Sequence, residues 1–106
     1  MAKKQIVPQG YHTVTPMIVV NDAAKALEFY KKAFGAEETL RMPGPDGRII
    51  HAEMRIGDSV VMLGDEMPDR EKYSPKKYGG SPVGFYVYVE DLDSAWKQAV
   101  DAGAKV

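Results

Sequence analysis

The chain has 106 residues, of which 44% are hydrophobic and 27% charged, as expected for one ordinary small globular domain. Its net charge of −1, without a block of lysine or arginine, argues against nucleic-acid binding. No apolar run approaches the ~18–20 residues of a membrane span, and no apolar segment follows the N-terminus as in a secretory signal. The absence of cysteine excludes disulfides and thiol chemistry and fits the cytoplasmic location that we expect.

Residues 1–10 are expected to form a loose lead-in, because a proline and a glycine interrupt regular structure there. The first compact unit is expected over residues 11–64. It opens with a strand over residues 11–20, where Val, Ile and Thr are frequent. An Asn-Asp cap then predicts a helix that ends near Phe34, because apolar residues recur at positions i, i+3, i+4 and i+7.

Three shorter strands are predicted after that helix, over residues 37–42, 48–56 and 59–63, with turn-forming residues between them. The Gly57-Asp58 pair suits a two-residue type II′ hairpin turn. The middle strand alternates, so its side chains divide between two faces. One face is predicted to carry Ile50, Ala52, Met54 and Ile56, and the other Ile49, His51, Glu53 and Arg55.

Residues 65–82 are polar and rich in Pro and Gly, and they are expected to form a linker loop that can lie over a site. Residues 83–106 predict a partial second unit with a strand over 83–89, a helix and the start of another strand. The buried stripe of this helix is expected to contain Leu92, Ala95, Trp96, Ala99 and Val100.

The two units share one pattern, since residues 17–36 and 86–104 each contain an apolar strand, an acidic cap, an amphipathic helix and a glycine stop. The first copy is followed by about thirty residues of strand-like sequence, and the second by almost none. The sequence therefore predicts an α+β fold of tandem βαβββ modules. We expect a curved mixed sheet with helices on its outer face and an incomplete second module.

The stretch from Asn21 to Ala36, the turn at residues 43–48 and the motif His51-Ala52-Glu53 resemble the vicinal oxygen chelate superfamily, and most closely its PhnB-like branch. That superfamily includes glyoxalase I, bleomycin- and fosfomycin-resistance proteins and extradiol dioxygenases. The resemblance implies paired modules around a cup. It indicates the fold more strongly than the reaction, because one fold hosts many chemistries.

In the superfamily's glyoxalase-like enzymes, the first and last strands of each module supply ligands to a divalent ion. The resemblance places the corresponding positions of this chain at Thr15, Met62 and Gly84. None of these is a His, Glu or Gln, the usual nitrogen and oxygen donors for such an ion. We therefore expect no metal cofactor here, although the resemblance leaves a divalent ion open.

His51 and Glu53 are the candidate catalytic residues, because side chains two apart on a strand share one face. They are a base with its orienting carboxylate, or two ligands of a non-standard ion. The alternative is a solvated or hydrogen-bonded strand face without a function. The side chains expected to bind the substrate on the same face of the cup are those of Met17, Val19, Tyr86 and Tyr88. The alternative is that these side chains pack against another module or a second chain.

Three functions stay open from the sequence. The first is the binding of a small hydrophobic or aromatic molecule in the cup between modules, without the usual metal. The second is a metal-dependent lyase, isomerase or dioxygenase-like enzyme, and the third is an isolated module without activity of its own. Unpaired sheet edges and apolar faces in the second unit also predict a homodimer, with exchange of modules as one route to it.

Overall fold

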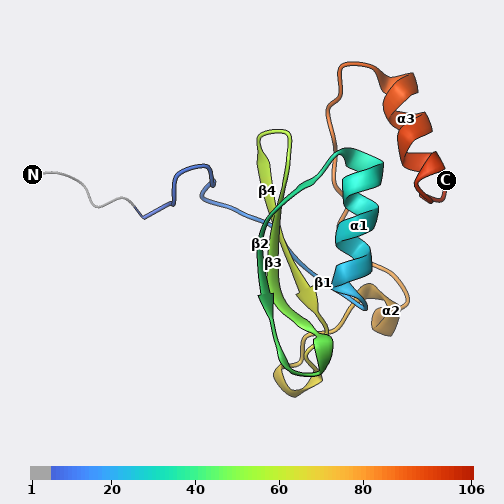
Figure 1. Ribbon diagram of the computed structural model, residues 1–106. Helices are drawn as coiled ribbons and strands as arrows, with labels where there is room; N and C mark the ends of the chain where they lie inside the picture. The colour runs from blue at the N-terminus through green and yellow to red at the C-terminus, as the bar shows by residue number, and fades with distance from the viewer. Residues whose placement is uncertain (1–5) are drawn as a thin grey trace, which may run out of the picture.

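The computed structural model describes residues 6–106, so the first half of the predicted lead-in lies outside the described residues. Figure 1 shows one sheet with the helices on one side, where the first long helix lies against the sheet and the last helix packs on that helix. Its strands are β1 (Met17–Val20), β2 (Glu37–Pro43), β3 (Ile49–Ile56) and β4 (Ser59–Asp65). The helices are α1 (Ala23–Phe34), α2 (Pro75–Tyr78) and α3 (Leu92–Asp101), with short 3-10 turns at Pro45–Gly47 and Pro68–Arg70.

The four strands lie in the order β1-β4-β3-β2. β1 runs parallel to β4, and the other neighbouring pairs are antiparallel. The chain order β1-α1-β2-β3-β4 is that of a βαβββ module, so the predicted α+β class and the predicted first module are confirmed. No helix lies over the sheet face opposite α1 within residues 6–106 (Figure 1).

Local sequence signals set the limits of α1. The Asp22 side chain accepts a hydrogen bond from the Lys25 backbone N–H at 3.1 Å and caps the first turn. Gly35 ends the helix in the left-handed conformation with φ of 66°, which a side chain would disfavour. Between these ends, Leu27 is completely buried in the core with Ala52 and Leu63 of the sheet.

Three predicted strands differ from the observed ones at their ends. β1 begins at Met17 rather than at residue 11, because Pro16 has no N–H to donate to a neighbouring strand. β2 and β4 continue to Pro43 and Asp65, beyond the predicted residues 42 and 63. Gly57 has φ of 60°, as the predicted hairpin turn requires.

The predicted alternation along β3 is wrong at its beginning. Ile49 is buried in the core, and Ile50 is partly exposed. The reason is an irregularity in the pairing with β2, where His51 lies opposite Met42 but Ile49 lies opposite Pro43. One extra residue in a strand shifts the inward and outward positions by one, as in a β-bulge.

The second unit forms less structure than predicted. Residues 83–89 form no strand, because this segment makes no strand pairing with the free edge of β1 or with any other described strand. Residues 104–106 form none either. α3 does form and packs on α1, where the Gln98 amide donates to the Lys32 carbonyl at 2.9 Å. Its apolar stripe is not buried, since Leu92 and Trp96 are mostly exposed without a sheet beneath them.

No helix within residues 6–106 combines the length and the apolar character that crossing a membrane requires.

Candidate functional site

The predicted polar pair lies on the sheet face turned away from α1. Ala52 belongs to the core beneath α1, so the next side chain on β3, that of Glu53, points to the opposite face. Glu53 lies opposite Leu40 on β2 and Met62 on β4, and Met62 lies opposite Met17 on β1. These four residues form a row across the whole sheet, and we call this surface the open face.

Glu53 is buried, with only 6% of the residue exposed, and its carboxylate takes part in two hydrogen bonds. His51 Nε2 lies 2.7 Å from Glu53 Oε2, and the Tyr11 hydroxyl donates to Oε1. Both carboxylate oxygens thus have a partner, as burial of a charged group requires. The sequence placed His51 and Glu53 on one face but missed Tyr11, which precedes β1 by several residues. We call these three residues the polar trio.

The hydrogen bonds fix the charge states of two members of the polar trio, Glu53 and Tyr11. Burial raises the pKa of the Glu53 carboxyl, but the bonds from Tyr11 and His51 outweigh it and hold that pKa below the ordinary value of 4.5. The pKa of the Tyr11 hydroxyl is raised above 10.0, chiefly because it is hydrogen-bonded to the Glu53 carboxylate. Near neutral pH, Glu53 is therefore an anion and Tyr11 a neutral donor.

Replacing Glu53 by glutamine should lower the free energy of unfolding by about 1–2 kcal/mol near neutral pH, the difference between hydrogen bonds to a charged acceptor and to a neutral one. Because the folded-state pKa of Glu53 is below the unfolded-state value, its ionised form stabilises the fold above that unfolded value. The contribution disappears as the pH falls through the folded-state pKa. Urea unfolding of both proteins, from neutral to acid pH, measures the difference.

A matched control is Glu37→Gln. Glu37 is an exposed carboxylate whose partner is Arg55 at 3.1 Å, and such surface pairs contribute about 0–1 kcal/mol. If the two glutamine variants were equally stable near neutral pH, the proposed stabilisation by the polar trio would be wrong.

Apolar side chains that are open to solvent surround the polar trio. Met17 and Leu40 are each 41% exposed, and Met42, opposite His51, is 48% exposed. Apolar side chains around a small number of fixed polar groups are typical of small-molecule sites. The open face therefore has the composition of a binding surface.

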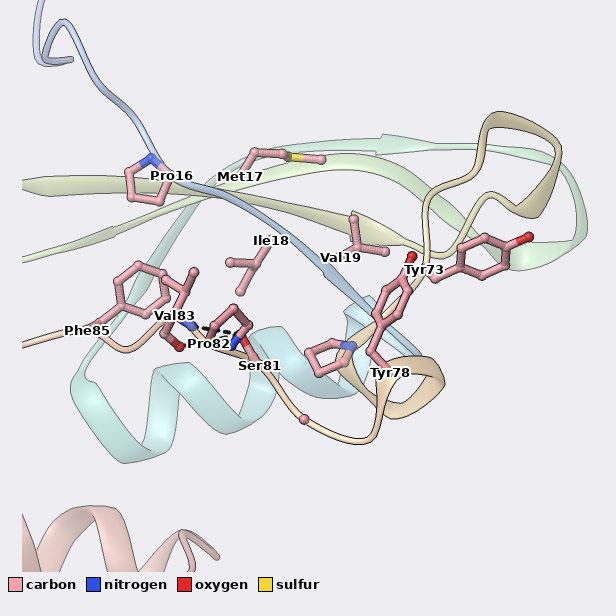
Figure 2. A pocket seen from close by; sticks show the side chains of 12 residues that line it. Pro16, Met17, Ile18, Val19, Tyr73, Tyr78, Ser81, Pro82, Val83 and Phe85 are labelled. Atoms are coloured by element: carbon pink, nitrogen blue, oxygen red, sulfur yellow. Dashed lines mark hydrogen bonds between the residues drawn. The ribbon is translucent and has the colours of Figure 1, made fainter.

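A groove with a volume of about 460 Å³ runs along β1, the edge strand of the sheet (Figure 2). Met17 and Val19, both predicted for the cup, line it. The other side of the groove is formed by residues that follow β4, among them Tyr73, Tyr78, Val83 and Phe85. Figure 2 shows the side chain of Ile18 between β1 and this segment.

Tyr86 and Tyr88, also predicted for the cup, do not line this groove. Their side chains are 93% and 94% exposed and project from the segment that forms no strand. Their proposed contact with a ligand stays a prediction. In their place the structure brings Tyr73 and Tyr78 to β1, and the only signal for them in the sequence was their aromatic character within a polar segment.

A buried serine fixes this segment beside β1. The Ser74 hydroxyl donates to Asn21 Oδ1 at 2.6 Å, and its backbone N–H donates to Glu66 Oε2 at 2.8 Å. The second bond also lowers the pKa of the Glu66 carboxyl. Tyr73, next to Ser74, thereby reaches the groove without being part of a helix or strand.

A family model described as the Glyoxalase/Bleomycin resistance protein/Dioxygenase superfamily matches residues 11–106. The chain belongs to this superfamily. The resemblance inferred from the residues around α1 and β3 is thus confirmed.

The chain is 45% identical over 96 residues to an uncharacterised protein of Mycobacterium bovis. These residues are 88% of this chain and 63% of the relative, so the chain spans less than two thirds of its length. A solved gene product of Arabidopsis thaliana is 29% identical with a TM-score of 0.72, covering 90% of this chain and 75% of that one. A PhnB protein of Bacillus cereus has the same fold, with 17% identity, a TM-score of 0.65 and coverage of 89% and 74%.

The residues at the superfamily's expected metal positions do not fit a divalent ion. The Thr15 hydroxyl already donates to the His12 carbonyl at 3.1 Å, Met62 offers a thioether, and Gly84 has no side chain. Hard and borderline divalent ions prefer carboxylate, imidazole or amide donors. Within residues 6–106, no three His, Asp or Glu side chains come together either. That the chain works without an ion stays a prediction.

Proposed function

We propose that this chain binds a small hydrophobic or aromatic molecule on the open face of the sheet and in the adjoining groove along β1. The observation that carries the proposal is the polar trio, which is held rigidly among exposed apolar side chains. Met17 lies both in the row across the open face and in the groove, so the two parts of the proposed site share one side chain.

The two parts of the site supply different contributions to binding. Covering the exposed side chains of Met17, Leu40 and Met42 removes apolar area from water, which contributes about 25 cal/mol per Å². The polar trio contributes orientation, because its geometry is fixed before the ligand arrives and little entropy is lost. The sequence analysis expected the cup between two modules, and the proposed site uses the groove lined by β1 and by residues beyond β4.

A metal-dependent lyase, isomerase or dioxygenase-like enzyme is the alternative, and the observation in its favour is the contact between His51 and Glu53. An imidazole and a carboxylate are both metal donors. Metal analysis of the purified protein separates the two functions. Stoichiometric metal that is lost in both His51→Ala and Glu53→Ala would favour the enzyme. If the protein binds neither a ligand nor a metal, the third function, an isolated module without activity of its own, is favoured.

A homodimer and a cytoplasmic location stay proposals. The apolar stripe of α3, with Leu92 and Trp96 mostly exposed, is surface that a second copy of the chain could cover. Sedimentation measures the oligomeric state.

The probe N-phenyl-1-naphthylamine, which is neutral and fluoresces when it leaves water, should bind the protein saturably. Met42→Lys should weaken that binding roughly tenfold, or about 1.4 kcal/mol, because the ammonium must be desolvated against an apolar ligand. Met42 is largely exposed, so the substitution is compatible with folding. Fluorescence titration measures both dissociation constants.

Leu92→Lys is the matched control, since it places the same charge at an exposed apolar position on α3, away from the open face. It should leave the dissociation constant unchanged. Equal weakening by both substitutions would point to binding elsewhere, and the absence of saturable binding would rule out the proposed function for this class of ligand.

A further inference from the structure

The contact between His51 and Glu53 determines which nitrogen of the imidazole is protonated. The Glu53 carboxylate is ionised near neutral pH and can only accept hydrogen bonds. His51 Nε2, 2.7 Å from Oε2, must therefore carry the proton. In a neutral imidazole protonated at Nε2, the other nitrogen, Nδ1, is an acceptor with a free lone pair.

Tyr11 makes this arrangement rigid. Its hydroxyl donates to Oε1, the oxygen of Glu53 that His51 does not use. Since both oxygens are engaged, a rotation of the carboxylate would break two hydrogen bonds at once. In the neutral imidazole, the tautomer with its proton on Nε2 and its lone pair on Nδ1 is thereby selected before any ligand binds.

Of the two groups, the imidazole is the one that a ligand can reach. The His51 side chain is 25% exposed, against 8% for the Glu53 side chain. Within residues 6–106, Glu53 is the one hydrogen-bond partner that the structure gives the His51 side chain. Met42 lies opposite His51 on β2, and it offers no hydrogen atom that could be donated to Nδ1.

We propose that the ligand of the open face carries a hydroxyl on its aromatic or other planar apolar skeleton, as in a phenol or enol, and that this hydroxyl donates a hydrogen bond to His51 Nδ1. The inference rests on the proposed function and names its ligand class. A ligand carboxylate is disfavoured, because at a neutral imidazole it would meet the Nδ1 lone pair beside the ionised Glu53. An ammonium group would lose its hydration among methionine and leucine side chains.

The proposed hydrogen bond from the ligand hydroxyl is tested with two naphthalene probes. 2-Naphthol has a hydroxyl hydrogen to donate, and in 2-methoxynaphthalene a methyl group replaces that hydrogen. The wild-type protein should bind 2-naphthol roughly fivefold more tightly, the size of one net hydrogen bond. His51→Leu should remove this preference while 2-methoxynaphthalene still binds. His51→Gln, whose amide oxygen is an acceptor, should restore part of it. Equilibrium titration of the wild-type protein and the two variants with both probes gives the three ratios of dissociation constants that are needed.

A merely structural role for His51 would weaken the binding of both probes equally and leave the ratio of their dissociation constants unchanged. The residues opposite His51 and Glu53 on β2 and β4 are Met42, Leu40 and Met62, and none of them can replace the imidazole as a nitrogen acceptor.

Nitrogen-15 chemical shifts of the wild-type protein keep the inference testable if the leucine variant does not fold. They should show the proton of His51 on Nε2 and a shift of Nδ1 when 2-naphthol is added. A proton on Nδ1, or equal affinity for the two probes, overturns the inference but leaves the proposed function standing. If neither probe binds, the proposed function itself fails.

Discussion

Replacing Leu27 by alanine is expected to lower the free energy of unfolding by about 2–5 kcal/mol, the range for leucine removed from a buried core. Leu27 lies on α1, is 0% exposed and belongs to the core cluster with Met54 and Leu63. The loss combines the lost burial of apolar atoms with the cavity that the smaller side chain leaves. Urea unfolding followed by circular dichroism measures it.

Leu92→Ala provides the control, because Leu92 is also on a helix but is mostly exposed. Substitutions at such positions usually change the free energy of unfolding by no more than about 0.5 kcal/mol. A similar loss in both variants would mean that α3 is buried in the protein as it exists, through a partner or a second copy. A negligible loss for Leu27→Ala would contradict the packing of α1 on the sheet.

The comparison with the sequence shows which parts of the fold have local causes. α1 was predicted from its Asn-Asp cap, its periodic apolar residues and Gly35, and each of these acts within a few residues of the chain. The turn at Gly57 is equally local. Features of this kind depend on short-range sterics and capping hydrogen bonds, so a single sequence contains the information for them.

Other features depend on which strands become neighbours. The irregular pairing that buries Ile49 instead of Ile50 involves Met42 and Pro43 on another strand, which no periodicity within β3 reveals. Residues 83–89 alternate as a strand should, yet they form none. A strand exists only through hydrogen bonds to a neighbour, and its own pattern cannot supply that neighbour.

The candidate site also has one part with a local cause in the sequence and one part that depends on a distant contact. His51 and Glu53 were predicted to share a face because side chains on a strand alternate, and the 2.7 Å contact joins them on the open face. Tyr11 lies 42 residues before Glu53 in the sequence, and its hydrogen bond results from the path of the chain before β1.

Asp65 was not singled out in the sequence, yet its replacement by alanine should cost about 3 kcal/mol or more. Its Oδ1 accepts the Ala23 backbone N–H and its Oδ2 accepts the Ile49 backbone N–H, each at 2.7 Å. Hydrogen bonds to a charged group contribute about 1.5–3 kcal/mol each, and the carboxylate also lies favourably at the N-terminus of α1. The substitution leaves two N–H groups in the partly buried region without partners.

The effect of Asp65 should be local as well as global, because one carboxylate joins the start of α1 to the start of β3. Hydrogen exchange should become faster at the amides of Ala23 and Ile49 before the rest of the sheet opens. Asp65→Asn, which keeps one acceptor oxygen, should lose about half as much stability. Asp101→Ala is the control, since the partner of Asp101 is Lys97 on the exposed surface of α3. If Asp65→Ala were no more destabilising than Asp101→Ala, the carboxylate would not hold β3 in the position from which His51 and Glu53 face the open side of the sheet.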